Sequence, residues 1–259
     1  MWAVVSTIVF LHAHPDDESI ATGGTMASLA DDGHRVVLVL ATRGELGEVA
    51  DGFLAEGETL TDRRVAETEA AAAILGVGRV AFLGYRDSGM MGEPSNDDLE
   101  SFWQADVEEA ATRLAAILRE EGADVVVAYD DHGNYGHPDH IQVHRVGVRA
   151  AALAGVARVF EATINREALS ESRPPGADDV PPEERRVGTP EAEITTAVDV
   201  GPWMARKKAA MLAHASQIPP DAWFFTMSPE AFAAVFGREW YIRRGAPPRV
   251  GDFESSLLP

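Results

Sequence analysis

Residues 7–18 read TIVFLHAHPDDE, so an apolar run passes directly into a cluster of polar side chains. The run Thr7–Ala13 is mostly apolar and shows no polar alternation, which is typical of a strand that is covered on both faces. We expect further strands of this kind at Arg35–Thr42, Arg79–Gly84, Asp124–Tyr129 and Arg158–Ile164. Strands covered on both faces predict a parallel sheet with helices on either side.

Segments with helical periodicity lie between these runs. We expect helices at Glu18–Asp32, Thr61–Leu75, Asp97–Glu121 and Asp139–Ala154. Gly33, Gly76 and Gly122 stand where the C-caps of three of these helices would be. The alternation of strands and helices predicts an α/β fold, a Rossmann-like doubly wound and mostly parallel sheet flanked by helices.

The pattern changes after Ile164, where prolines are mixed with charged residues. The segment Ser170–Glu193 is therefore predicted to be a loop or lid. Beyond it we expect a strand at Ile194–Val200, helices at Pro202–Ser216 and Pro229–Phe236, and a final strand at Trp240–Arg243. None of these is long enough for an independent domain. We expect one domain over 1–259, with a Rossmann-like core at 1–165 and a smaller lid and C-terminal subregion at 166–259.

The composition excludes several classes of protein. There is no cysteine, which excludes a disulfide scaffold, a thiolate zinc site and a cysteine nucleophile, and which fits the cytosol. Lys and Arg number 22 against 42 Asp and Glu, and the resulting net charge of −20 repels nucleic acids and anionic membranes. The apolar start Trp2–Leu11 has no preceding positive charge and is too short to span a bilayer. We therefore expect a cytoplasmic protein that binds neither nucleic acids nor membranes, and a homo-oligomer stays open.

Two polar clusters follow strands at the same edge of the predicted sheet. One is His14-Pro15-Asp16-Asp17-Glu18, and the other, His137-Pro138-Asp139-His140, lies beyond the strand Asp124–Tyr129. If the strand order is 3-2-1-4-5, the ligand-binding crevice of a doubly wound sheet lies outside the carboxyl ends of the first and fourth strands. Both clusters should then meet in that crevice.

A purely structural interpretation of each cluster is also open. Asp16 and Asp17 are suitable helix caps, and a glycine-rich loop with a capped helix accounts for much of the second cluster. It does not account for two histidines. A catalytic zinc ion takes about three protein ligands from His nitrogen and carboxylate oxygen. Adjacent carboxylates do not easily bind one tetrahedral ion together, so one of the two aspartates should stay free to move protons.

The strings Ala13-His14-Pro15-Asp16-Asp17-Glu18 and His137-Pro138-Asp139-His140 resemble the two motifs of the LmbE-like or PIG-L family. Members of this family are zinc-dependent N-deacetylases that act on substrates containing N-acetylglucosamine. The resemblance covers about the first 150 residues well and the remainder in patches.

The resemblance implies a role for each residue of the two motifs. Zinc would be ligated by His14, Asp17 and His140. Asp16 would be the general base, His137 would stabilise the oxyanion or act as an acid, and Asp139 would orient His137. A His₂Asp site also suits Fe²⁺ or another divalent metal, because affinity order alone does not decide which ion is bound.

More of the chain resembles the branch of the family that includes the mycothiol-pathway deacetylase and the mycothiol-conjugate amidase. The matching strings are Thr42–Glu48, Arg64–Glu67, Tyr85–Met90 and Ala213–Gln217. In that branch Tyr135 would lie near the reacting carbonyl. The substrate-binding candidates are Arg64, Asp87, Glu45, Met90 and His214.

Each of these residues also has a structural interpretation. Arg64 would pair with Glu67 on a solvated helix face, Asp87 would cap a turn, and His214 would be a buried polar group. His144 lies one turn beyond His140 and is therefore a further candidate ligand.

The sequence thus predicts a metal-dependent hydrolase that removes an N-acetyl group from an N-acetylglucosamine-type conjugate. The alternatives are an amidase that cleaves a larger acyl group from a mycothiol-like conjugate, and a non-catalytic zinc- or carbohydrate-binding module. Motifs for a dinucleotide cofactor, a P-loop or a serine hydrolase elbow are absent from the sequence.

Overall fold

The computed structural model describes residues 5–171, 187–247, 249 and 251–259. Within them seven strands form one sheet in the order β3-β2-β1-β4-β5-β7-β6. The strands are β1 (Thr7–His12), β2 (Arg35–Leu40), β3 (Arg79–Phe82), β4 (Val125–Tyr129), β5 (Arg158–Thr163), β6 (Thr196–Asp199) and β7 (Arg238–Arg243). Most of the predicted loop Ser170–Glu193 lies outside the described residues.

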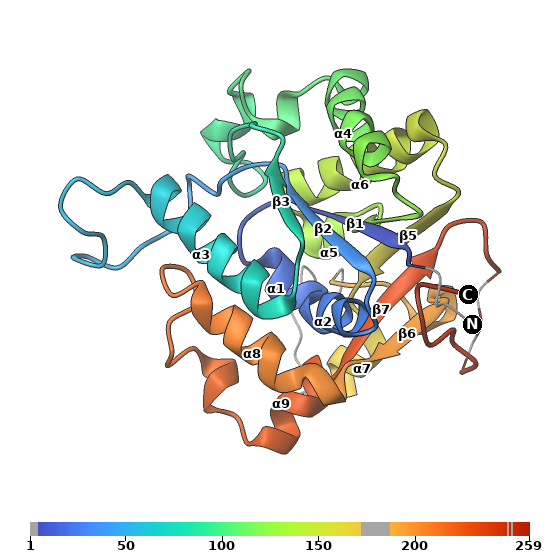
Figure 1. Ribbon diagram of the computed structural model, residues 1–259. Coiled ribbons are helices and arrows are strands. Elements are labelled where there is room, and N and C mark those ends of the chain that lie inside the picture. Colours follow the sequence, from blue (N-terminus) through green and yellow to red (C-terminus); the bar gives the residue numbers. More distant parts are fainter. Residues whose placement is uncertain (1–4, 172–186, 248, 250) are drawn as a thin grey trace.

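The first five strands are parallel, and β7 pairs antiparallel with both β5 and β6 (Figure 1). The predicted order 3-2-1-4-5 and the mostly parallel α/β fold are confirmed. The two C-terminal strands extend the same sheet beyond β5. This arrangement makes the carboxyl ends of β1 and β4 neighbours, because Phe10 in β1 pairs with Val127 in β4.

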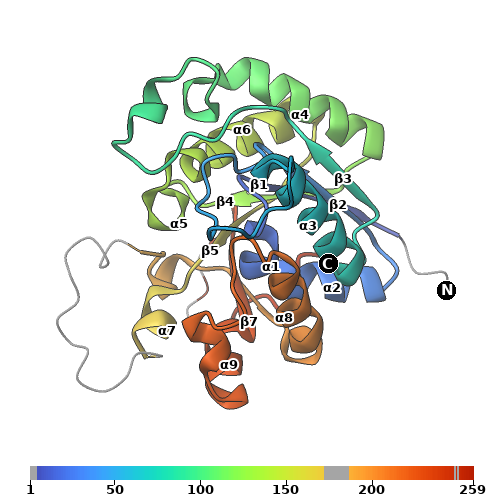
Figure 2. The same cartoon turned by 90° about the vertical axis from the view of Figure 1, so that its left-hand side faces the viewer.

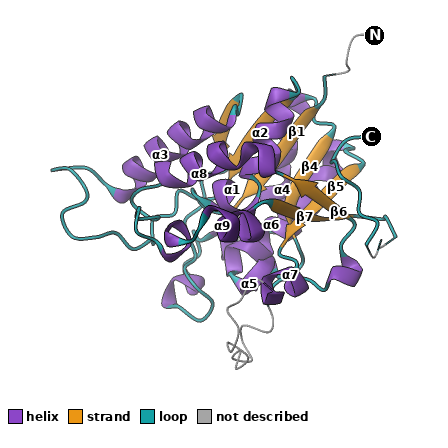
Figure 3. Ribbon diagram, turned by 90° about the horizontal axis from the view of Figure 1, so that it is seen from below, coloured by secondary structure: helices purple, strands orange, loops and turns teal. Residues whose placement is uncertain are grey.

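Helices cover both faces of the sheet (Figures 2 and 3). Their bounds are α1 (Asp17–Ala21), α2 (Gly23–Asp31), α3 (Leu60–Leu75), α4 (Val107–Glu121), α5 (Gly133–Gly136), α6 (Pro138–Ala154), α7 (Arg166–Glu171), α8 (Met204–Ala213) and α9 (Pro229–Phe236). Helices α4 and α6 pack together on one face, while α2, α3 and α8 lie together on the other. None of the helices in the described ranges has the length and apolar character needed to cross a membrane.

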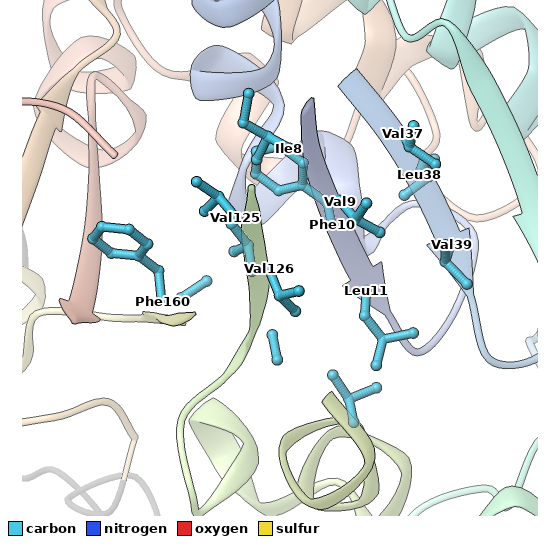
Figure 4. Close-up of a cluster of buried hydrophobic side chains, with 14 of the residues drawn as sticks. Ile8, Val9, Phe10, Leu11, Val37, Leu38, Val39, Val125, Val126 and Phe160 are labelled. Atoms are coloured by element: carbon cyan, nitrogen blue, oxygen red, sulfur yellow. The ribbon is translucent and has the colours of Figure 1, made fainter. Parts of the chain in front are cut away.

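The core is built from the apolar strands, as Figure 4 shows for side chains of β1, β2, β4 and β5. Ile8, Phe10, Leu38 and Val126 have no exposed surface. Burying a side chain of this size contributes about 1.5–3 kcal/mol. Because the strands are buried on both faces, their ends are fixed in space, and so are the loops that leave them.

The expected helix Glu18–Asp32 is two helices, which is a correction. Helix α1 ends before Thr22, and a second helix, α2, begins at Gly23. The carboxylate of Glu239, from distant β7, accepts hydrogen bonds from the backbone N–H groups of Gly24 and Thr25, both at 2.8 Å. A carboxylate at this position satisfies free N–H groups and complements the helix dipole. The break therefore depends on a partner that lies far away in the sequence.

The expected helix Asp97–Glu121 is α-helical only over α4. Two short 3₁₀ turns precede it, and Asp106 caps α4 by accepting from the N–H of Glu109 at 2.9 Å. Phe102, in one of these turns, is completely buried. Its burial favours a compact turn over a continuous helix.

We predict that Gly24→Ala destabilises the protein by about 1–3 kcal/mol, as expected for overpacking. An added Cβ at Gly24 would lie 2.7 Å from Val200 Cγ1, closer than carbon atoms can approach. Gly23→Ala is the matched control, because its Cβ would meet Leu75 at an ordinary 3.5 Å. Denaturant titration measures both variants, and equal midpoints would contradict the prediction.

Candidate functional site

The two polar clusters meet at the carboxyl edge of β1 and β4. His14 lies in the loop after β1, and Asp17 is the first residue of α1. His137 is the N-cap of α6, and His140 lies in its first turn. The ring of His14 lies 4.7 Å from that of His137 and 5.6 Å from that of His140, measured between centroids. The meeting expected from strand order is confirmed.

Two histidines of this cluster, His14 and His140, approach the same carboxylate oxygen of Asp17. Asp17 Oδ2 lies 3.4 Å from His14 Nδ1 and 3.3 Å from His140 Nε2. Ligands about 2.0–2.1 Å from a tetrahedral zinc ion are roughly 3.3 Å apart. His14, His137 and His140 also place ligand nitrogens within 4.8 Å of one another. The residues therefore fit a divalent metal, and they do not by themselves identify it.

Negative charge surrounds His14. Burial alone would lower the pKa of His14, but hydrogen bonds with Asp139, Asp17 and Asp87 raise it well above its usual value. Conversely, His140 and His14 hold the pKa of Asp17 well below its usual range in spite of burial. The site thus attracts positive charge, whether from a proton or from a metal ion.

Asp139 orients His14 rather than His137, which corrects the expectation. The completely buried carboxylate of Asp139 accepts from His14 Nε2 at 3.0 Å, from the N–H of Ser88 at 3.0 Å, and from the Ser88 hydroxyl. Only the backbone N–H of Asp139 reaches His137, at Nδ1. A carboxylate that fixes one imidazole nitrogen leaves the other, here His14 Nδ1, free to bind a metal.

His137 is a neutral hydrogen-bond donor at the site. Burial, together with the nearby His14 and His140, lowers its pKa to about 4. Because Nδ1 accepts the backbone N–H of Asp139 at 3.1 Å, the proton of the neutral ring sits on Nε2. The other nitrogen therefore presents an N–H group.

Asp16 has an unusual backbone, with φ 94° and ψ −34°. A non-glycine residue with positive φ is strained and persists only where its surroundings fix it. The side chain of Asp16 makes no capping hydrogen bond to α1, so the structural interpretation of this residue as a helix cap is wrong. Burial raises its pKa to about 6, although the charge of Arg64 opposes that shift.

Arg64 clamps the loop that carries Asp16. Its guanidinium donates to Gly44 O at 2.7 Å and to Pro15 O at 2.5 Å, and Nη2 lies 3.3 Å from Asp16 Oδ2. An added Cβ at Gly44 would overlap the guanidinium, which explains the glycine there. Arg64 is only 4% exposed, so the interpretation as a solvated helix face is wrong. These contacts give Arg64 a positioning role, and its expected contact with substrate stays a prediction.

Glu67 does not pair with Arg64 among the described contacts. Its carboxylate accepts the N–H and the hydroxyl of Ser216, at 2.9 and 2.6 Å.

Asp87 and Glu45 form one wall beside His14. Asp87 Oδ1 accepts the N–H of Gly89 at 2.9 Å and lies 3.5 Å from His14 Nε2. Glu45 accepts the N–H of Asp87 at 3.2 Å. These contacts couple the loops after β2 and β3 to the candidate metal ligands.

Met90 and Tyr135 are the exposed candidates, each with 47% of its surface open. The Tyr135 hydroxyl lies 3.5 Å from His140 Nε2, on the same side as Asp17. Tyr135 is therefore accessible to a molecule that approaches the cluster, and the side chain of Met90 is open to solvent.

Two further candidate histidines make contacts away from the trio of His14, Asp17 and His140. His214 has no exposed surface, and its Nε2 lies 2.7 Å from Glu18 Oε1, so it does not offer a surface to substrate. His144 Nδ1 contacts Tyr129 O at 3.1 Å and Glu161 at 3.5 Å, so it is directed away from Asp17.

Sequence reasoning missed Glu18 and Ser88 as parts of the site. Both are completely buried. Glu18 belongs to the first polar cluster, and Ser88 lies in Tyr85–Met90, one of the strings that match the family branch. The sequence therefore places both residues near the site, but it does not indicate their partners from distant parts of the chain.

Comparison with known proteins places the chain in a family. The family model described as PIG-L: GlcNAc-PI de-N-acetylase matches residues 9–151, which include both polar clusters. The chain belongs to the PIG-L family. As a PIG-L member it is a metal-dependent amide hydrolase.

Relatives with similar sequences extend the match beyond that region. This PIG-L member is 42% identical to the 1D-myo-inositol 2-acetamido-2-deoxy-alpha-D-glucopyranoside deacetylase of Thermomonospora curvata, over 97% of this chain and 95% of the relative. Among solved structures, it resembles the N,N'-diacetylchitobiose deacetylase of Pyrococcus horikoshii with a TM-score of 0.64 at 23% identity, over 92% and 83% of the two chains.

The fold alone does not fix the reaction of a PIG-L-like protein. The 4-carboxy-2-hydroxymuconate hydratase of Pseudomonas putida shares the fold with a TM-score of 0.57 at 18% identity, over 96% of this chain and 99% of the other. The reaction must therefore be argued from the site and from the closer relatives.

Proposed function

We propose that this protein hydrolyses the acetamide of an N-acetylglucosamine unit joined to inositol, releasing acetate and the free amine. The observation that carries this proposal is the strained loop at Asp16, which places this carboxylate next in the chain to Asp17, the residue that both His14 and His140 contact. The match in sequence to inositol-linked 2-acetamido sugar deacetylases supports the substrate class, because it extends over nearly the whole chain.

His14, Asp17 and His140 would hold the metal, and we propose Zn²⁺, for which two imidazoles and one carboxylate are suitable ligands. Fe²⁺ is the alternative ion. When bound, a divalent cation supplies Lewis-acid chemistry, since it lowers the pKa of water and polarises an amide carbonyl.

Asp16 accepts the proton of the attacking water. With a pKa of about 6, its carboxylate is largely ionised at neutral pH yet basic enough to take a proton. Arg64 keeps Oδ2 of Asp16 oriented and at the same time holds the preceding carbonyl, that of Pro15. The base is thus positioned through both its side chain and its backbone.

His137 stabilises the oxyanion that forms at the acetamide carbonyl. Its Nε2–H group is a neutral donor within a largely buried site, where such hydrogen bonds are most effective. Tyr135 lies beside His140 and is exposed, so its hydroxyl is suitably placed to contact the same carbonyl.

Asp87, Glu45 and Met90 are proposed to contact the sugar. The two carboxylates are hydrogen-bond acceptors for hydroxyl groups, and Met90 offers an exposed apolar surface. With a net charge of −20, the protein favours a neutral polyol over an anionic conjugate. The cytoplasmic location remains a prediction.

An amine-release assay on the zinc-loaded protein tests the proposal. We expect kcat/KM for N-acetylglucosaminyl-inositol to exceed that for free N-acetylglucosamine by about 10²-fold or more, since remote binding energy contributes to catalysis. Faster cleavage of a bulky thioether-bearing amide would instead identify an amidase of larger acyl groups. Bound zinc and sugar without amine release would identify a binding module.

A further inference from the structure

Two side chains hold the main chain on either side of Asp16. Arg64 donates to Pro15 O, and the carboxylate of Glu18 accepts the backbone N–H of Asp16 at 3.0 Å. A positive φ at a residue with a side chain persists only where its neighbours fix it. Glu18 is therefore part of what keeps the base in its conformation.

Glu18 is itself fixed from a distant part of the chain. It has no exposed surface, and its second oxygen, Oε1, accepts from the Ser19 hydroxyl at 2.6 Å and from His214 Nε2 at 2.7 Å. A buried carboxylate requires partners of this kind, because burial removes the water that would otherwise solvate it. Ser19 is next to Glu18 in α1. Of the two contacts to Oε1, the one from His214 therefore comes from a distant part of the chain.

The end of α8 brings His214 to this position. Helix α8 packs against α1 and α3, on the face of the sheet opposite α4 and α6 (Figures 1 and 2). His214 follows the last residue of α8 and is completely buried. The next residues contact other segments. Ser216 donates a hydrogen bond to the carboxylate of Glu67, and the Gln217 side chain donates to the carbonyl of Glu48. The chain at 214–217 therefore fastens three segments near the site.

We propose that Glu18 and His214 are a positioning pair for the base Asp16. His214 donates from Nε2 to Glu18, and Glu18 in turn accepts the N–H of Asp16, so that the carboxylate of Asp16 points at the reacting water. The proposal rests on the role of Asp16 in the proposed function. Neither member of the pair touches substrate.

The test replaces His214 by Leu and by Gln. Leu removes the donor, whereas Gln can present an amide N–H near the position of Nε2. Nδ1 of His214 has no partner among the described residues, so Gln need replace only one contact. For His214→Leu we expect kcat to fall about 10–100-fold, because a small misplacement of a catalytic group lowers the rate by that order. KM and metal content should stay near those of the parent, and His214→Gln should recover most of kcat.

Hydrogen exchange of the Asp16 amide gives a readout that needs no catalysis. If Glu18 is released in His214→Leu, the Asp16 N–H loses its fixed acceptor and should exchange faster than in the parent. Ser216→Ala is the matched control. This substitution removes a buried hydrogen bond between the same segment and Glu67. Among the described residues the Ser216 side chain makes no hydrogen bond to Glu18, so the contact between Glu18 and His214 is left in place. It should lower stability but leave both kcat and Asp16 exchange unchanged.

Several outcomes would overturn the proposal. Parent-like kcat in His214→Leu would do so, as would a Gln variant as impaired as the Leu variant, or equal losses in the Ser216→Ala control. If His214→Leu does not fold, Glu18→Gln replaces it, because its amide cannot accept from both the Asp16 N–H and His214. If the parent releases no amine, the proposed function fails, and the exchange measurement still decides whether the pair fixes Asp16.

Discussion

Asp16→Asn is expected to lower kcat by about 10²–10⁴-fold, the usual contribution of a general base. The amide of Asn has nearly the same shape as the carboxylate but cannot take a proton at neutral pH. Asn also tolerates positive φ better than other residues with a side chain, so the conformation at φ 94° should survive. The loss should therefore come from chemistry and not from the backbone.

Metal content separates this prediction from a general collapse of the site. The Asp16→Asn protein should bind as much zinc as the parent, measured by elemental analysis after dialysis, because His14, Asp17 and His140 are unchanged. Asp131→Asn is the control for loss of a carboxylate at the same edge, since the side chain of Asp131 is 83% exposed. A kcat near that of the parent for Asp16→Asn would show that another group takes the proton.

The second large effect is expected for the metal itself. His140→Ala should weaken zinc binding by about 10²-fold or more. Replacing a residue that only hydrogen-bonds to a metal ligand already lowers metal affinity by about 10–100-fold, and His140 is proposed as a ligand itself. His140 offers Nε2, which lies 3.3 Å from Asp17 Oδ2. Activity should disappear together with the metal and return in part at high zinc concentration. Zinc titration of the chelator-treated protein, followed by calorimetry, measures the change.

His144→Ala is the matched control for His140→Ala. The two histidines lie in α6, one turn apart, and His144 contacts Tyr129 O and Glu161 instead of the ligand trio. Its loss should change the free energy of unfolding while leaving zinc affinity within about threefold of the parent, an effect of less than about 1 kcal/mol. Equal weakening in both variants would mean that the metal is not held where we place it.

The order of the strands could be predicted because it depends on local signals. Apolar runs such as Thr7–Ala13 and Asp124–Tyr129 are buried on both faces, and strands of this kind form parallel sheets with restricted topologies. Once the order is fixed, the loops after β1 and β4 must share an edge. That argument predicts the meeting of His14 with His140 from strand order alone.

Contacts between distant residues could not be predicted in this way. The family resemblance implies that Asp139 orients His137, which is close to it along the chain, yet the carboxylate of Asp139 lies against His14, 125 residues away. From the sequence, Arg64 could be a substrate-binding residue or a surface residue. Only the packed structure shows that its guanidinium donates to the carbonyl groups of Gly44 and Pro15. Each depends on how two loops approach one another, which residue spacing does not encode.

The position of His214 and Glu239 in the C-terminal part of the chain has a consequence for the first polar cluster. His214 contacts Glu18, and Glu239 contacts the start of α2, so both reach the surroundings of that cluster from far along the sequence. The candidate ligands are gathered at the edge of β1 and β4, whereas the loop around Asp16 also depends on residues beyond β5. A substitution in the C-terminal third of the chain can therefore alter the first motif without replacing any candidate ligand.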